Sequence, residues 1–375
     1  MKHYLLMLPG PVEVRPEVLA HMSRPMVAHL GPDFNAFYYS LLDKIKGLFR
    51  TEGKVWVLPG SGSTALNAGI VNLASDKDEI LICSNGFFGE VLVEMAEAHG
   101  VPYKTICIPR GGAIDPEDVR RALKENPKTR AVYIIYSESS TGVANPVKDV
   151  GSVVREFGCL YFVDAVSAVG GMELAMDDWN IDFCAAGSQK CLGAPPGIAI
   201  CAVGPRGLEH IRSRTDIRGW VNNLQLWEKY EPDPLEPYPV TLPGNLLFSL
   251  DEGINCILEE GLQECVKRHS DIARFVRKGF KAMGARPVAE DEKASSTVTA
   301  AFLPEGVNPP DVVEYVKRVH GIEIRGGLGD FGSKIIRMGH MAYVAQYRFV
   351  VPTLYAVEDA LRHFGVKTER GGFLH

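Results

Sequence analysis

Short apolar runs and amphipathic stretches alternate along the first half of the chain. Continuous apolar runs are typical of buried strands, whereas apolar positions that recur every three to four residues indicate helices. Strands are therefore expected at 55–58, 79–83, 103–107, 131–136, 159–164, 181–186 and 198–203, and helices at 64–73, 87–98, 115–124 and 147–157. Such alternation predicts an α/β fold, with a largely parallel sheet and helices on both of its faces.

The pattern changes in the second half. The segment from Glu231 to Pro243 carries five prolines and is expected to form no regular element. One long amphipathic helix is expected from Leu247 to about Met283. A smaller α+β unit follows, with strands at 297–302 and 322–325 and helices near 310–319 and 351–364. We expect three parts: an N-terminal arm (1–20), a large domain (21–260) and a small domain (261–375).

Composition narrows the class of protein. The chain has 375 residues, of which 46% are hydrophobic and 23% charged, as in ordinary globular proteins. A net charge of −6 argues against a general nucleic-acid or membrane-surface partner. No apolar run is long enough to span a bilayer, and the N-terminus lacks a signal-peptide profile. The eight cysteines form no C-x-x-C pair and no zinc-like cluster, so we expect no metal, reduced thiols and a cytoplasmic location.

Lys190 is the first candidate for chemistry. It follows the apolar run that ends in Ala186, after Gly187-Ser188-Gln189, and a stiff Gly/Pro corner separates it from the next run, which starts at Ile198. Burial at such a corner lowers the pKa of a lysine and makes its amine available to form a Schiff base, including one with pyridoxal phosphate. The alternative is an ordinary solvated lysine in a turn.

Asp164 is the second candidate. It ends a continuous apolar run, and ligands of open α/β sheets bind beyond the carboxyl ends of strands. A carboxylate there can pair with a protonated pyridine nitrogen. It can equally cap the segment that follows, and the sequence leaves both interpretations open.

Three further loops follow predicted strands. Pro59 to Ala65 joins a strand to a helix and contains Gly60, Gly62 and three hydroxyl residues, which suits a phosphate but also matches a dinucleotide-binding G-x-G-x-x-A pattern. Ser137 to Gly142 is crowded with hydroxyls, although a plain loop looks the same. Ser84 to Gly89 places aromatic rings where one can stack on a planar cofactor, or simply join the core.

Taken together, these blocks resemble the class V aminotransferases of fold type I, in the alanine–glyoxylate and serine–pyruvate branch. The likeness runs from Pro9-Gly10-Pro11 to the closing helix. It is sharpest at Glu138-Ser139-Ser140-Thr141-Gly142-Val143 and at Gly187-Ser188-Gln189-Lys190 with Ala194-Pro195-Pro196-Gly197. The resemblance implies a large domain with a mostly parallel seven-stranded sheet, a smaller α+β C-terminal domain and a homodimer.

The resemblance also implies roles for individual residues. Lys190 is expected to carry pyridoxal phosphate and to move the substrate proton, while Asp164 holds the ring nitrogen and Arg337 the substrate α-carboxylate. The other cofactor contacts are expected from Ser61, Gly62, Ser63, Phe88, Ser139 and Gln189, and from Tyr238 and Thr241 of the neighbouring subunit. The position of Ser63 is a histidine in some relatives.

The implied reaction moves an amino group from a small amino acid, alanine or serine, to a 2-oxo acid, glyoxylate or pyruvate. Aspartate- and aminoethylphosphonate-specific class V enzymes are alternatives, as is an inactive binding protein with this fold. A cysteine desulfurase needs a nucleophilic cysteine on a loop of the small domain, but no cysteine follows Cys265, which falls within the long helix expected from Leu247 to about Met283. An NAD-dependent dehydrogenase leaves Lys190 and Arg337 without a role. Arg325 is interpreted as a solvated residue rather than as a ligand for a second carboxylate.

Overall fold

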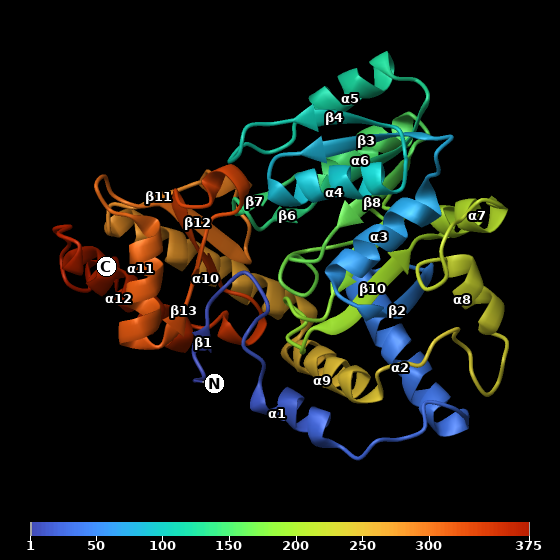
Figure 1. Cartoon of the computed structure of the whole chain (residues 1–375), viewed down its shortest axis with the longest axis horizontal. Coiled ribbons are helices and arrows are strands. Elements are labelled where there is room, and N and C mark those ends of the chain that lie inside the picture. Colours follow the sequence, from blue (N-terminus) through green and yellow to red (C-terminus); the bar gives the residue numbers. More distant parts are fainter. Residues whose placement is uncertain (1, 375) are drawn as a thin grey trace.

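A seven-stranded sheet forms the centre of the large domain in the computed structural model, which describes residues 2–374 (Figure 1). The strand order is β2 (Lys54–Gly60), β10 (Gly197–Val203), β9 (Phe183–Gly187), β8 (Leu160–Asp164), β5 (Thr129–Ile135), β3 (Glu79–Ser84) and β4 (Tyr103–Cys107). Only the contacts of β10 with its two neighbours are antiparallel, and the others in this sheet are parallel. The predicted largely parallel sheet is confirmed.

Helices cover both faces of this sheet. A Cβ added to Gly69 in α3 (Gly62–Leu73) would overlap the ring of Phe162. A Cβ added to Gly151 in α6 (Val147–Glu156) would lie 3.1 Å from the ring of Tyr161. Because successive residues of a strand point to opposite faces, α3 and α6 pack on opposite sides of β8. The remaining helices of the large domain are α1 (Pro16–Ala20), α2 (Pro32–Phe49), α4 (Phe87–Ala98), α5 (Pro116–Glu125), α7 (Pro205–Ser213) and α8 (Leu224–Tyr230).

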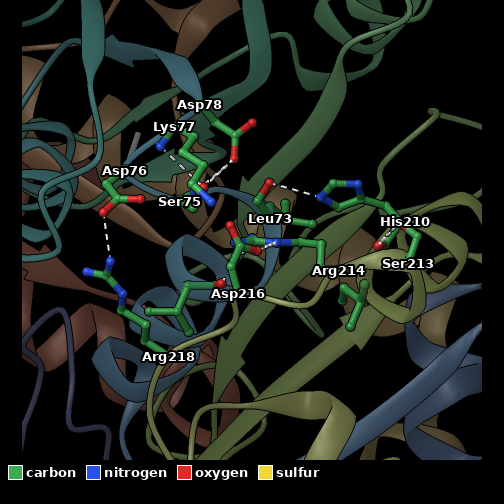
Figure 2. Close-up of polar contacts among 12 residues, drawn as sticks. Leu73, Ser75, Asp76, Lys77, Asp78, His210, Ser213, Arg214, Asp216 and Arg218 are labelled. Carbon is green, nitrogen blue, oxygen red and sulfur yellow. Dashed lines mark hydrogen bonds and ion pairs between the residues drawn. The ribbon is translucent and has the colours of Figure 1, made fainter.

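Polar contacts hold the turn between α3 and β3 against the segment that follows α7 (Figure 2). Arg218 Nη2 lies 2.7 Å from Asp76 Oδ2, and His210 Nε2 lies 3.1 Å from the Leu73 carbonyl oxygen. The Arg214 side chain is 7% exposed, and its Nη1 donates to the carbonyl oxygen of Val71 in α3 at 3.1 Å. These contacts fix the end of α3 that is farther from its glycine-rich start.

The connection between the two domains differs from the sequence expectation. Two helices, α9 (Gly244–Glu260) and α10 (Leu262–Ala282), stand where one long helix was expected. Gly261 between them has φ 87°, a left-handed conformation that glycine tolerates and that ends a helix. The expectation of a single helix was therefore wrong. The segment from Glu231 to Pro243 forms no helix or strand, as its prolines predicted.

The small domain contains a four-stranded antiparallel sheet in the order β11 (Arg286–Pro287), β12 (Val298–Phe302), β15 (Ile335–Gly339) and β14 (Arg325–Gly326). Its helices include α11 (Pro309–Tyr315) and α12 (Tyr347–His363). The single strand expected at 322–325 is two short strands, because β13 (Ile322–Glu323) pairs with β1 (Leu5–Leu6) of the N-terminal arm. Leu5 and Leu6 of the arm therefore pair with the small domain, whereas Val18, farther along the arm, packs in the core of the large domain.

Two separate groups of buried apolar residues support these two units. One extends from Val18 to Cys265, and the other combines Met7 with residues between Ile272 and Phe373. Within residues 2–374, no helix is both long and apolar enough to cross a membrane.

Candidate active site

The polar loops singled out in the sequence lie at one edge of the central sheet. Asp164 ends β8, Lys190 follows β9, and the loop after β5 begins at Tyr136. These three strands are parallel neighbours, so their carboxyl ends meet at the same edge. Ser61 follows β2, which runs in the same direction because β10 is antiparallel to both β2 and β9. The topology therefore brings the four candidate segments together.

Lys190 occupies the predicted corner between β9 and β10. Its Nζ donates a hydrogen bond to the carbonyl oxygen of Pro9 in the N-terminal arm. A Cβ on Gly10 would lie 2.7 Å from Nζ, so only glycine permits the arm to approach the amine this closely. Burial lowers the pKa of Lys190 to about 8, and the nearby Asp164 carboxylate partly opposes that shift. The amine is thus much nearer to deprotonation at neutral pH than a free lysine.

Asp164 is buried at the end of β8 with 5% of its surface exposed. Its Oδ1 accepts a hydrogen bond from the Val166 backbone N–H at 2.8 Å, so the local capping interpretation is correct as far as it goes. Burial raises the pKa of Asp164 to about 7, and Lys190 acts in the opposite direction. A buried carboxyl of this kind gains most from a cationic partner, which is what a protonated ring nitrogen provides.

The start of α3 offers backbone N–H donors beside Gln189. The backbone N–H groups of Gly62 and Ser63 lie in the first helical turn, where no intrahelical acceptor exists, at the positive end of the helix dipole. A Cβ on Gly187 would lie 2.9 Å from Gly62 N and 2.8 Å from Gln189 Oε1, so the Gln189 carboxamide borders the same place. That carboxamide oxygen is buried and has no hydrogen-bond partner among the described residues. Ser61 borders the helix as its N-cap, and the Ser63 side chain is exposed.

Arg337 brings the small domain to this edge. It lies on β15 with 6% of its surface exposed, and its Nη1 donates to the Ser139 carbonyl oxygen at 3.0 Å. Its Nε donates to the Gly326 carbonyl oxygen at 2.8 Å, so two of the five N–H donors of the guanidinium are used. Burial lowers the pKa of Arg337 to about 10. The remaining donors can bind a carboxylate.

Tyr238 and Thr241 are placed differently. The Tyr238 ring packs against Phe34 and Tyr38 of α2, and its hydroxyl donates to the carbonyl oxygen of His29 in the same chain. Thr241 is exposed. Their contact with a neighbouring subunit stays a prediction.

Two groups that lie at this edge of the sheet, the Pro9 carbonyl and the Glu138 side chain, were not identified from the sequence. The Pro9 carbonyl reaches Lys190 across 181 residues of chain, and no local pattern reveals such a contact. Glu138 was noticed only as part of a motif, yet it is fully buried and accepts hydrogen bonds from the start of α4. The signal available was an acidic residue set between serines at the end of an apolar run.

Pyridoxal phosphate-dependent enzymes of fold type I share three features with this structure. These are a mostly parallel sheet, a lysine that follows the carboxyl end of one strand (Lys190 after β9), and a buried aspartate at the carboxyl end of the neighbouring strand (Asp164 in β8). Comparisons with known proteins narrow this class. The family model for aminotransferase class V matches residues 17–345. An uncharacterised aminotransferase of Methanocaldococcus jannaschii is 34% identical over 98% of this chain and 95% of its own length. The alanine–glyoxylate aminotransferase of Mus musculus is 30% identical over 96% of this chain and 88% of its own.

Solved structures agree with the sequence matches. The ureidoglycine–glyoxylate aminotransferase of Bacillus subtilis superposes with a TM-score of 0.93 at 31% identity, covering 100% of this chain and 97% of that one. The chain belongs to the class V aminotransferases, which use pyridoxal phosphate. The N–H groups in the first turn of α3 and the NH₂ group of the neighbouring Gln189 carboxamide can donate to the phosphate of this cofactor, and Lys190 and Asp164 fit its aldehyde and its ring nitrogen.

Proposed function

We propose that this aminotransferase moves the amino group of a small amino acid, alanine or serine, to glyoxylate or pyruvate, in two half-reactions at one site. The observation that carries the choice of a small substrate is the contrast between two arginines on neighbouring strands. Arg337 is buried at the site, whereas the Arg325 side chain is 55% exposed and lies 3.3 Å from Glu323. One buried arginine suits one carboxylate, and Arg325 is already occupied at the surface.

The acceptor is supported by the relatives. The names of the mouse and Bacillus subtilis proteins both specify glyoxylate, while their amino donors differ. A shared acceptor with variable donors is expected where the clamp for the α-carboxylate is constant and the rest of the pocket varies.

The roles of the residues follow from the geometry. Pyridoxal phosphate, when bound, supplies an electron sink for the electrons left at the substrate Cα after loss of a proton. Arg337 orients the substrate through its carboxylate, and lysine in its place lacks the planar fork that makes two parallel hydrogen bonds. Lys190 Nζ accepts and returns the proton, for which a pKa of about 8 is suitable. Asp164 keeps a positive charge on the ring nitrogen.

The decisive experiment is a panel of amino donors (alanine, serine, aspartate, glutamate and aminoethylphosphonate) tested against glyoxylate, pyruvate and 2-oxoglutarate. We expect alanine or serine with glyoxylate or pyruvate to give the highest kcat/KM. A preference for aspartate, glutamate or the phosphonate would overturn the substrate assignment and leave the family unchanged.

Attachment of the cofactor is tested separately. Borohydride reduction followed by peptide mapping should place the pyridoxyl group on Lys190. A label on another lysine would end the assignment of Lys190.

We further propose a homodimer in a cytoplasmic compartment, in which each site receives Tyr238 and Thr241 from the neighbouring subunit. Large apolar side chains are exposed on residues 22–30 and at Leu235, which precedes Tyr238 in the chain. The Gly31 N–H donates to the Leu235 carbonyl oxygen at 2.9 Å, which places the two parts of this surface together. The exposed apolar residues are Met22, Met26, Val27, Leu30 and Leu235. Burial of such a surface favours association of two copies. The cysteines are all free, as a reducing compartment requires.

Subunit complementation tests the shared site. A Lys190→Ala chain is mixed with a chain that carries Tyr238→Phe and Thr241→Ala, where phenylalanine preserves the buried ring packing. In a hybrid dimer one site holds every lesion and the other holds none, so activity should partly return. Absence of recovery, with subunit exchange demonstrated, would show that each chain completes its own site.

A further inference from the structure

The helix α4 starts without a capping side chain of its own. Its N-cap is Gly86, and the N–H groups of the next three residues have no acceptor within the helix. Two side chains from the loop after β5 supply acceptors instead. Ser140 Oγ accepts from the Phe87 N–H at 3.0 Å, and Glu138 Oε2 accepts from the Phe88 and Gly89 N–H groups at 3.0 and 3.3 Å.

Glu138 is built into this position. It is fully buried, and its second oxygen, Oε1, accepts from Ser140 N at 3.0 Å and from Ser140 Oγ at 2.6 Å. A Cβ on Gly86 would overlap the Glu138 side chain, so the absence of a side chain at Gly86 is what admits the carboxylate. Burial raises the pKa of Glu138, and its four hydrogen bonds act in the opposite direction. The positive end of the α4 dipole also favours the ionised form.

The same carboxylate connects two groups of the candidate site. Phe88, whose backbone N–H it accepts, is the residue expected over the cofactor ring. Ser139 lies between Glu138 and Ser140, and its carbonyl oxygen accepts from Arg337 Nη1. Glu138 also stabilises the Arg337 cation electrostatically. The buried Glu138 side chain therefore contacts the first turn of α4 and also stabilises Arg337 of the small domain.

We propose that Glu138 is a positioning residue that caps α4 from across the sheet edge and thereby fixes Phe88 and Arg337 relative to each other. This inference rests on the proposed function for the part that concerns substrate binding.

Glu138→Gln is the direct test, because glutamine has the same shape but only one acceptor oxygen. Its NH₂ group must then face N–H donors, so part of the cap is lost. A matched control is Glu90→Gln, which removes a negative charge from the first turn of the same helix. Glu90 is exposed and pairs with Arg110 at 2.6 Å, outside the capping contacts. Glu138→Asp retains the negative charge, so it should keep part of the capping that Glu138→Gln loses.

Hydrogen exchange of the cofactor-free chain is the first measurement. In Glu138→Gln the amides of Phe87, Phe88 and Gly89 should exchange about tenfold faster or more, as expected when a hydrogen bond of ordinary strength is lost. The amides of the central sheet should keep their wild-type protection from exchange. In Glu90→Gln these amides should exchange at the wild-type rate. Wild-type exchange in Glu138→Gln, or equal acceleration throughout the chain, would overturn the capping role.

Kinetics of the holoenzyme is the second measurement. In Glu138→Gln the KM for the amino donor should rise about tenfold, and kcat should fall by less, because the misplaced group is the carboxylate clamp. Loss of kcat with unchanged KM would overturn the link to Arg337. If Glu138→Gln does not fold, Ser140→Ala decides the question through the same two readouts, with smaller changes in the same direction. A wild-type protein that transfers no amino group, with the exchange result intact, would refute the proposed function and leave the cap standing.

Discussion

The Asp164→Asn substitution separates the electrostatic role of this residue from its structural one. Asparagine preserves the oxygen that accepts from Val166 at 2.8 Å, so the end of β8 should keep its conformation. It removes the negative charge that faces Lys190 and, in the holoenzyme, the ring nitrogen. Loss of the charge should therefore lower catalysis without lowering the stability of the cofactor-free chain.

Turnover should fall. A hydrogen bond to a charged group in a buried site contributes roughly 1.5–3 kcal/mol. Loss of that amount from the transition state lowers kcat roughly tenfold to a hundredfold. The assay is steady-state transamination with the best donor and acceptor, at saturating pyridoxal phosphate.

Stability of the cofactor-free chain should not fall. Burial raises the pKa of Asp164 from 3.8 to about 7, so at higher pH the folded chain holds a carboxylate that would rather be protonated. Three units correspond to roughly 4 kcal/mol, an upper bound because the asparagine amide must also be desolvated. Between pH 4 and 7 the folded state binds the proton more tightly than the unfolded state, so this contribution to stability is lost as pH rises.

Thermal unfolding of the cofactor-free proteins at about pH 8 should therefore give Asp164→Asn a midpoint equal to or above that of the wild type. A kcat within twofold of the wild type would refute the assignment of Asp164 to the ring nitrogen. A large drop in the unfolding midpoint would show that the residue is needed for the fold rather than for the chemistry.

Two other predictions concern charge. Arg337→Lys should raise the KM for amino acids by more than it lowers kcat and leave the visible spectrum of the bound cofactor unchanged, and an unaffected KM would point to Arg325 as the clamp. His269 and His340 are fully buried, and burial lowers their pKa values from 6.5 to about 4 and about 3. Each histidine is protonated at a higher pH in the unfolded chain than in the folded chain. The free energy of unfolding should therefore decrease as pH falls from 6.5 toward 4, by roughly 2–3 kcal/mol for each histidine at about pH 4.5. Urea unfolding of Asp164→Asn between pH 7 and 4.5 measures this loss without the opposing contribution of Asp164, whose raised pKa stabilises the fold as pH falls, and a flat profile in that variant would contradict it.

Most of the central sheet was predictable because its inner strands are buried on both faces, whereas the edge strand β4 is partly exposed. Apolar runs such as 131–136 and 159–164 carry their own signal, and a strand of the sheet appeared at each of the seven expected positions. The break at Gly261 was not predictable by the same means, since the helical period continues on both sides of it. The strand β15 was missed, and β13 and β14 were merged into one expected strand, because these strands are defined by their pairing with distant segments rather than by a local pattern.

Lys190 and Asp164 were recognisable because a charged residue at the end of a buried apolar run is unusual. The contacts that complete the site come from distant parts of the chain. Glu138 and Phe88 are 50 residues apart, and Lys190 and Pro9 are 181 apart. The proposed role of Tyr238 requires a second copy of the chain, so it stays a prediction.

The two helix starts at this edge illustrate what the sequence leaves undecided. Both α3 and α4 follow a strand through a short segment that contains glycine, and both offer N–H groups to an anion. The glycine and hydroxyl content of 59–65 favoured α3 for the phosphate, but the sequence did not exclude α4. In the folded chain Glu138 supplies α4 with an anion from within the protein. Because a helix start that already holds a buried carboxylate repels a second anion, we expect the cofactor phosphate at α3, beside Gln189.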